Sequence, residues 1–214
     1  MNQDNIQRGN NTLEHWNEKH HTYGTIDKPY EEVAPKDWET LLLADQGCTI
    51  ALVKDNHEAI KRNSLLDIGC AHGTMLWYLK EKIIPNWDIT GMDFSDFIIE
   101  SNKRRYDKVT WEQRDILLNP LDKDFGIITC LQTIEHFAEG DNYRFLDNIL
   151  EHCEYLVLAT VDTKDDCFGE HISHYDIDIM DRKGYNVLWK NKLQEIQMPD
   201  GIYHYIIFLI KGKL

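Results

Sequence analysis

Apolar and polar positions along this 214-residue chain form blocks of two different periods. Short, mostly apolar runs predict buried strands at 64–69, 87–93, 109–115, 125–132 and 154–161. Segments with apolar residues at helical spacing lie between them, at 74–84, 95–106 and 141–153, and Ser95 is the expected N-cap of the second. Strands that alternate with amphipathic helices predict a parallel sheet covered on both faces.

The two ends of the chain complete this picture. After a short helix within 171–183, the runs 185–190 and 201–212 predict two strands with no helix between them, so this pair should be antiparallel. Near the start, 37–60 predicts two helical segments divided at Gly47. We therefore expect an α/β, doubly wound (Rossmann-like), mostly parallel seven-stranded sheet with a final antiparallel strand. Residues 61–214 would form this domain, and residues 1–60 a helical N-terminal extension or lid.

Charge and cysteine content narrow the class of protein. The 23 basic and 37 acidic residues give a net charge of −14, which disfavours nucleic acid as a partner. The basic run 102–105 (NKRR) is interpreted as a solvated helix face. Five widely spaced cysteines indicate free thiols rather than a disulfide framework or a zinc site. With no apolar run of about 20 residues and no secretory signal pattern, we expect a soluble, cytoplasmic protein without membrane contact.

The segment SLLDIGCAHG, residues 64–73, carries the first chemical signal. Its D-x-G-x-x-x-G spacing differs from the dinucleotide-binding motif, and no lysine follows as in a P-loop. An acid at Asp67 would repel a pyrophosphate and favour a cationic group, such as an ammonium or a sulfonium. Asp93 ends the second predicted strand, where a carboxylate can accept hydrogen bonds from ribose hydroxyls. Asp115 ends the third, where its side chain could meet an adenine amino group.

The stretches LLDIGCAHG, ITGMDFS, RDIL and IITCLQTIEHF resemble the successive motifs of class I S-adenosylmethionine-dependent methyltransferases. The resemblance spans roughly residues 60–210, and it implies S-adenosyl-L-methionine as the cofactor. His72 and Cys70 depart from the commonest first motif; His72 could cap a helix or touch substrate, and Cys70 is interpreted mainly as packing. The resemblance implies a cofactor site formed by Asp67, Gly69, Cys70, Ala71, Gly73, Asp93, Phe94, Asp115, Ile116 and Leu131.

Candidate catalytic residues follow the fourth and fifth strands: Glu135, His136, His171 and His174. Three hypotheses remain open for them. They could be structural or surface residues, a histidine could be a general base with a near-neutral pKa, or they could ligate a divalent metal. The third resembles the metal-dependent enzymes that methylate the 2′-hydroxyl at small-RNA 3′ ends. Gln132 stands where those carry a glutamate, and the acidic net charge also counts against RNA, so no metal is expected.

Taken together, these features predict an enzyme that methylates a small-molecule acceptor. A hydroxyl of a sugar, a nucleotide-sugar or a quinone precursor is favoured, because several candidate bases cluster past the fourth strand. The alternatives are the metal-dependent RNA 3′-end 2′-O-methyltransferase and a non-catalytic partner subunit with the methyltransferase fold. In the N-terminal segment, Trp16 and Tyr23 are candidates to cover the cofactor, whereas the histidines there are expected to be solvated: His15, His20 and His21.

Overall fold

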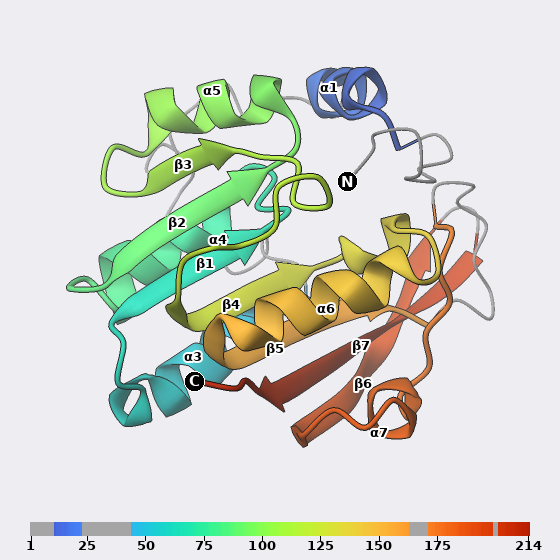
Figure 1. The fold of residues 1–214 in the computed structure, drawn as a ribbon. Coiled ribbons are helices and arrows are strands. Elements are labelled where there is room, and N and C mark those ends of the chain that lie inside the picture. The colour runs from blue at the N-terminus through green and yellow to red at the C-terminus, as the bar shows by residue number, and fades with distance from the viewer. Residues whose placement is uncertain (1–10, 23–43, 163–170, 199–200) are drawn as a thin grey trace.

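A computed structural model describes residues 11–22, 44–162, 171–198 and 201–214 (Figure 1). The strands of this part form one seven-stranded sheet with the order β3-β2-β1-β4-β5-β7-β6. Their bounds are β1 Ser64–Ile68, β2 Asp88–Asp93, β3 Thr110–Gln113, β4 Phe125–Leu131, β5 Cys153–Val161, β6 Val187–Met198 and β7 Gly201–Lys211. The helices are α1 Leu13–Thr22, α3 Ala44–Asn56, η3 His57–Ala59, α4 Thr74–Tyr78, η4 Leu79–Ile83, α5 Asp96–Arg105, η5 Ile134–His136, α6 Asp141–Glu151 and α7 Ile179–Arg182.

Strand direction brings the loops of interest to one edge of the sheet. β1 pairs in parallel with β2 and β4, and β4 pairs in parallel with β5. β7 runs antiparallel between β5 and β6. The carboxyl ends of β1, β2, β4 and β5 therefore point the same way, toward the side of the molecule where α1 lies (Figure 1). In open α/β sheets this edge is where ligands bind.

Helices cover both faces of the sheet, as the alternating pattern predicts. One apolar core joins α3, α4 and α5 to the sheet through residues such as Val53, Leu76 and Ile98. The other joins α6 and α7 to the opposite face through residues such as Leu146 and Met180. The predicted fold class is confirmed, including the final antiparallel strand pair.

Several local features differ from the sequence prediction. Gly47 does not end a helix; it lies inside α3, because the buried side chains of Thr49, Ile50 and Val53 hold the helix against the core beyond it. β6 extends to Met198, well past the predicted run, since it pairs with β7 along most of its length. Residues 37–43 of the predicted helical segment lie outside the described residues.

Other local predictions are confirmed. Ser95 is the N-cap of α5, and its hydroxyl accepts a hydrogen bond from Ile98 N at 3.3 Å. In the basic run 102–105, Lys103 and Arg104 are exposed, although Asn102 is buried. The described cysteines are free thiols, and Cys167 lies outside the described residues.

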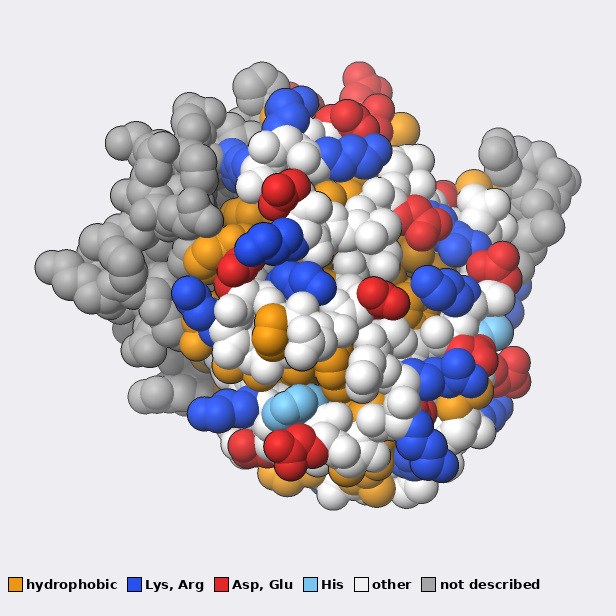
Figure 2. Space-filling model, turned by 90° about the vertical axis from the view of Figure 1, so that its left-hand side faces the viewer, with side chains coloured by type: hydrophobic (Ala, Val, Ile, Leu, Met, Phe, Trp, Pro, Cys, Tyr) orange, Lys and Arg blue, Asp and Glu red, His pale blue; other side chains and the backbone are white. Residues whose placement is uncertain are grey.

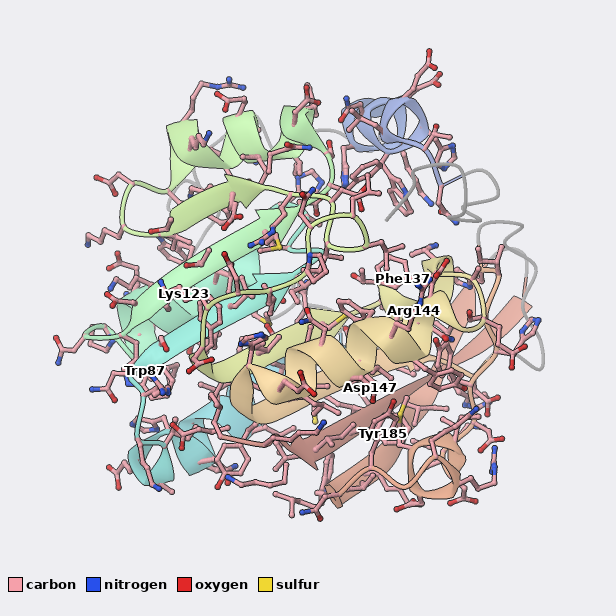
Figure 3. All side chains as sticks on the ribbon, viewed as in Figure 1. Trp87, Lys123, Phe137, Arg144, Asp147 and Tyr185 are labelled. Atoms are coloured by element: carbon pink, nitrogen blue, oxygen red, sulfur yellow. The ribbon has the colours of Figure 1, made fainter. Side chains whose placement is uncertain are left out.

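The end of the molecule away from α1 carries charges of both signs. Figure 2 shows acidic and basic side chains interspersed over this face, without a patch of one sign. Figure 3 places Trp87 and Lys123 toward this end, and Phe137 at the opposite one, beyond β4. Within the described chain, we find no helix with the length and apolar character needed to cross a bilayer.

Candidate active site

The turn after β1, residues 69–73, requires glycine at two positions. Gly69 and Gly73 have φ angles of 75° and 67°, and Ala71 between them has a φ of 43°. A Cβ atom on Gly69 would lie 2.0 Å from Thr133 Oγ1, and one on Gly73 would lie 2.2 Å from the Trp111 ring. Both glycines therefore allow a backbone path and a close approach that other residues would prevent.

Asp93, the last residue of β2, fixes this turn. Its Oδ2 atom accepts a hydrogen bond from Ala71 N at 3.0 Å, and its Oδ1 atom accepts one from Ser95 N at 2.9 Å. Asn102 of α5 supports the turn from the other side by donating to Ala71 O at 2.7 Å. Burial raises the pKa of Asp93, while these backbone hydrogen bonds lower it. Each carboxylate oxygen retains a second lone pair for a ligand donor.

Two more buried carboxylates accompany Asp93. Asp67 in β1 is 5% exposed and accepts a hydrogen bond from Thr129 Oγ1 at 2.6 Å. Burial raises its pKa to about 7, the Thr129 hydrogen bond lowers it, and the charges of Asp93 and Asp45 raise it further. Asp45 in α3 is fully buried, and Gln132 Nε2 donates to its Oδ2 at 2.8 Å. The carboxyl edge of the sheet is thus strongly electronegative, which suits a cationic ligand.

A second group of side chains lies past β4. Glu135 in η5 is fully buried, and its Oε2 accepts a hydrogen bond from Thr160 Oγ1 at 3.1 Å. The ring centroids of His136 and His171 are 5.0 Å apart. Candidate ligand atoms of Glu135, His136 and His171 all lie within 4.8 Å of one another. His174 is exposed and does not belong to this group.

Backbone hydrogen bonds bring His171 to this position. Ile172 N and Ser173 N both donate to Glu135 O, at 2.9 and 3.1 Å. These bonds dock the segment after β5 onto η5. The Ser173 hydroxyl also donates to Phe137 O, although the two residues lie 36 positions apart in the chain. The three side chains are therefore placed by the backbone of the loops that carry them.

The histidine group adjoins the acidic group. The buried thiol of Cys130 in β4 lies close enough to both Glu135 and Asp67 that each carboxylate raises its pKa, in addition to the larger effect of burial. Thr133, whose hydroxyl lies beside Gly69, donates to Leu131 O at 3.1 Å. The arrangement therefore places buried carboxylates, which suit a cation, beside a group of two imidazoles and a carboxylate.

Comparisons with known proteins agree with this geometry. Residues 66–154 match the family model described as a methyltransferase domain. The fold is similar to that of magnesium protoporphyrin IX methyltransferase (ChlM) from Synechocystis PCC 6803 with bound SAM, with a TM-score of 0.65, 10% identity, and coverage of 99% of this chain and 100% of that one. The chain is therefore similar to methyltransferases in sequence over residues 66–154 and in fold over nearly its whole length.

A second solved structure has a similar fold. N-methyltransferase NodS from Bradyrhizobium japonicum WM9, in complex with S-adenosyl-L-homocysteine, has a TM-score of 0.66 and 14% identity, and the match covers 92% of this chain and 98% of that one. At these identities the likeness establishes the fold alone. No match was found among curated protein sequences.

The remaining predicted cofactor residues lie along the same edge. Asp115 Oδ1 accepts a hydrogen bond from Leu117 N at 3.2 Å, so its side chain shapes the turn after β3. That turn stays beside β2 because Arg114 N donates to Asp93 O at 2.9 Å. Ile116 and Cys70 are buried in the two apolar cores, and Phe94 and Leu131 are partly exposed.

Helix α1 connects the two groups. Its Trp16 ring contacts the His136 ring at 4.8 Å between centroids, and its His20 ring lies 5.8 Å from that of His72. Burial, chiefly, lowers the pKa of both His20 and His72 to about 4, so both rings are neutral at pH 7 and add no positive charge. The side chain of His21 and the whole of Tyr23 lie outside what the structure describes.

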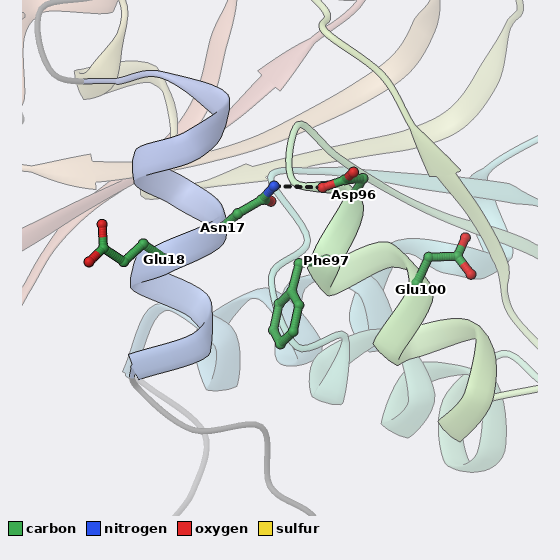
Figure 4. A pocket seen from close by; sticks show the side chains of 5 residues that line it. All are labelled: Asn17, Glu18, Asp96, Phe97 and Glu100. Atoms are coloured by element: carbon green, nitrogen blue, oxygen red, sulfur yellow. Dashed lines mark hydrogen bonds between the residues drawn. The ribbon is translucent and has the colours of Figure 1, made fainter.

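Asn17 attaches the other side of α1 to the start of α5. Its amide nitrogen donates to Asp96 Oδ1 at 2.6 Å, and Ser95 Oγ donates to its amide oxygen at 2.5 Å. Figure 4 shows the contact between Asn17 and Asp96, beside an open groove between the two helices that Glu18, Phe97 and Glu100 also line. Helix α1 thus reaches from the end of β2 to the end of β4.

Sequence reasoning missed several residues of this site. Asp45 lies within a segment read only as helical, and nothing in its spacing indicated burial beside Asp67. In the sequence Gln132 stands out only because a glutamate is missing there, but its φ of 50° and its hydrogen bond to Asp45 give it a positioning role. Thr129 lies in the otherwise apolar strand β4, and its hydroxyl donates to Asp67. A polar residue within such an apolar run is the sequence signal that could have identified it.

Proposed function

We propose that this methyltransferase transfers the methyl group of S-adenosyl-L-methionine to a hydroxyl of a small-molecule acceptor. The observation that carries the proposal is the convergence of three buried carboxylates and a glycine turn beside a histidine group. A sulfonium compound with an ammonium group is a cation that this electronegative edge would stabilise. The acidic net charge of −14 supports a small acceptor over a polyanion.

The residues present fit this cofactor. Asp67 would face its cationic amino-acid end, and Asp93 would accept hydrogen bonds from the ribose hydroxyls. The turn 69–73 lets the backbone approach closely, and Asp115 with Ile116 would frame the adenine. When bound, the cofactor supplies an electrophilic methyl group on sulfur.

Glu135, His136 and His171 would act on the acceptor. Methyl transfer to oxygen requires that the hydroxyl lose its proton and that the oxygen lie in line with the methyl carbon and sulfur. The histidine group adjoins the acidic crevice, so it can orient an acceptor oxygen and promote loss of its proton. His174 is exposed, so we leave it out of this role.

Helix α1 would serve as a lid over the cofactor. It contacts η5 through Trp16 and the start of α5 through Asn17, which lie on the two sides of the proposed crevice. A lid in this position would exclude water from the reacting atoms. Within the predicted extension, residues 1–60, this assigns closure of the site to α1 alone, because α3 of the same segment packs into the core.

Calorimetry with S-adenosyl-L-methionine, followed by methyl transfer to a panel of acceptors, tests the proposed function. We expect micromolar binding to the intact chain, and turnover with sugars, nucleotide-sugars or quinone precursors that carry a free hydroxyl. His136→Ala should retain cofactor binding and lower kcat by about 10²–10⁴-fold, whereas His57→Ala, at the other end of the molecule near Trp87, should change neither. Absence of binding heat would refute the proposal, and binding without turnover on any acceptor would favour a non-catalytic partner subunit.

RNA 3′ ends belong in the same panel. The cluster of Glu135, His136 and His171 is the observation that favours a metal-dependent RNA 2′-O-methyltransferase. Charge argues against it, and Gln132 is hydrogen-bonded to Asp45. Turnover confined to RNA would replace the small acceptor with this alternative.

Cofactor binding should release a proton near neutral pH. The pKa of Asp67 is raised to about 7, chiefly by burial, and a cation beside it would lower that pKa again. Affinity should therefore fall as the pH drops below about 7, because protonated Asp67 must first lose its proton. Calorimetry in buffers of different ionisation enthalpy measures the released proton.

Asp67→Asn is the matched variant for this prediction. It should abolish the proton release and flatten the pH dependence, at the cost of weaker binding. Because the folded-state pKa of Asp67 is raised, its stabilising contribution is complete below pH 3.8 and is lost as the pH rises through about 7. The variant should therefore unfold less readily than the parent at about pH 8. Unchanged proton release in Asp67→Asn would contradict the assignment.

A further inference from the structure

We propose that Glu135, His136 and His171 form a binding site for a divalent transition-metal ion that holds and acidifies the acceptor hydroxyl. This inference rests on the proposed function for the identity of the acceptor, but the metal site itself follows from the described residues. It replaces the expectation, drawn from the sequence, that no metal is used.

The geometry is close to that of a metal site. Two imidazoles and one carboxylate present ligand atoms that all lie within 4.8 Å of one another. Zinc binds such nitrogen and oxygen atoms at about 2.0–2.2 Å, so adjacent ligands of a tetrahedral site lie roughly 3.4 Å apart. Small side-chain rotations of His136 and His171, which are both partly exposed, would close the set.

Hydrogen bonds between neighbouring groups fix the two loops that carry the ligands. Ser173 Oγ donates to Phe137 O, and Asn142 Nδ2 donates to Ser173 Oγ at 3.2 Å and to Tyr175 Oη at 2.7 Å. Tyr175 Oη in turn donates to Ile134 O at 3.3 Å. These buried groups tie the loop that carries His171 to η5, which carries the other two ligands. Such supporting hydrogen bonds are what orients the ligands of metal sites.

Charge around the group favours a cation. Glu135 is fully buried, and its charge contributes to the raised pKa of Cys130, Tyr175 and Tyr205, for each of which burial is the larger cause. Asp45 and Asp67 add further negative charge from the adjoining crevice. A divalent ion would offset this accumulated negative charge.

The donor set indicates which ions fit. Gln132 is not part of this group, and its amide nitrogen donates to Asp45 Oδ2 at 2.8 Å. Two imidazoles and one carboxylate suit Zn²⁺, Co²⁺ or Mn²⁺ better than Mg²⁺, which prefers oxygen ligands. Three protein ligands leave a coordination position for an exogenous oxygen.

The ion would change how the acceptor loses its proton. Beside a divalent cation the pKa of a hydroxyl falls, so its proton can pass to water instead of to an imidazole. The acceptor oxygen then forms a bond to the methyl carbon as the carbon–sulfur bond breaks, and the electron pair of that bond remains on sulfur. Trp16, stacked edge-on against His136, would cover this position.

Cobalt titration tests the site without cofactor or acceptor. The full-length chain is stripped with a chelator and titrated with Co²⁺, and visible absorption reports ligation by imidazole. We expect one ion per chain, and roughly 10–100-fold weaker binding in Glu135→Gln and His136→Ala. His57→Ala is the control histidine, because it lies near Trp87 at the opposite end. Circular dichroism checks that each variant is folded.

The outcomes separate this inference from the proposed function. Cobalt binding that depends on Glu135 and His136 supports the metal site, even if S-adenosyl-L-methionine produces no binding heat. Undetectable cobalt binding, or binding equally strong in Glu135→Gln and His136→Ala, overturns the metal site. If the cofactor still binds in that case, an imidazole removes the proton directly. For a variant that fails to fold, His171→Ala replaces it in the same titration.

Discussion

Replacing Asp93 by asparagine is expected to weaken binding of S-adenosyl-L-methionine by about 100-fold, because two charge-assisted hydrogen bonds to ribose hydroxyls would become neutral ones. Asp93 is suited to this role because it ends β2 at the carboxyl edge of the sheet. It also accepts backbone hydrogen bonds from Ala71 and Ser95, at 3.0 and 2.9 Å. Asparagine keeps only one acceptor oxygen, so one of these two backbone hydrogen bonds is lost as well, but its nearly identical shape should preserve the fold. Calorimetry measures the loss of affinity.

Two controls separate ligand binding from support of the turn. Asn102→Ala removes a hydrogen bond to Ala71 O from the side of the turn opposite Asp93. It should lower stability with a much smaller effect on affinity. Glu100→Gln, on the exposed face of α5, should change neither quantity. If Asp93→Asn binds the cofactor as tightly as the parent, the ribose assignment is wrong.

Gly73→Ala should lower the free energy of unfolding by about 2–4 kcal/mol. The φ of 67° at this position costs an L-residue roughly 1–2 kcal/mol. In addition, the new Cβ would lie 2.2 Å from the ring of Trp111, which is itself buried between strand and helix. The ring cannot move without disturbing the core around Tyr106, whose carbonyl accepts its indole N–H at 3.0 Å. Thermal or denaturant unfolding measures the effect.

Gly47→Ala is the matched control, since it makes the same chemical change with the opposite expected sign. Gly47 lies on the exposed side of α3, and a Cβ there would meet no atom within 4 Å. Because alanine favours the helix, this variant should be more stable by about 0.5–1 kcal/mol. Destabilisation of both variants by similar amounts would contradict the structural argument for Gly73.

The order of elements was predictable because periodicity reports burial directly. Leu65, Leu66 and Ile68 belong to a continuous apolar run, which is typical of a strand covered on both faces of the sheet. In the structure all three are almost completely buried. The N-cap at Ser95 was predictable because it depends only on nearby residues: the serine hydroxyl accepts a hydrogen bond from Ile98 N. Where longer contacts overrode local preference, prediction failed: Gly47 remains helical because the residues after it pack into the core.

The acidic residues at the strand ends were also visible in the sequence. Asp67, Asp93 and Asp115 lie at or near the ends of successive strands, and parallel strands bring such positions to one edge. Their roles in cofactor binding remain predictions. Sequence placed Glu135 and His136 after the fourth strand, but it did not distinguish a surface pair from a buried group.

The amino-acid sequence alone determined the α/β class, the boundaries of most elements and the edge where the chemistry should lie, because these depend on local periodicity and on the regular geometry of parallel strands. Folding in three dimensions determined which distant residues meet. Asp45 approaches Asp67 from α3, Trp16 reaches His136 from α1, and the loop of His171 docks onto Glu135 through backbone hydrogen bonds. These contacts depend on how separate segments pack, and no spacing within any one segment encodes them.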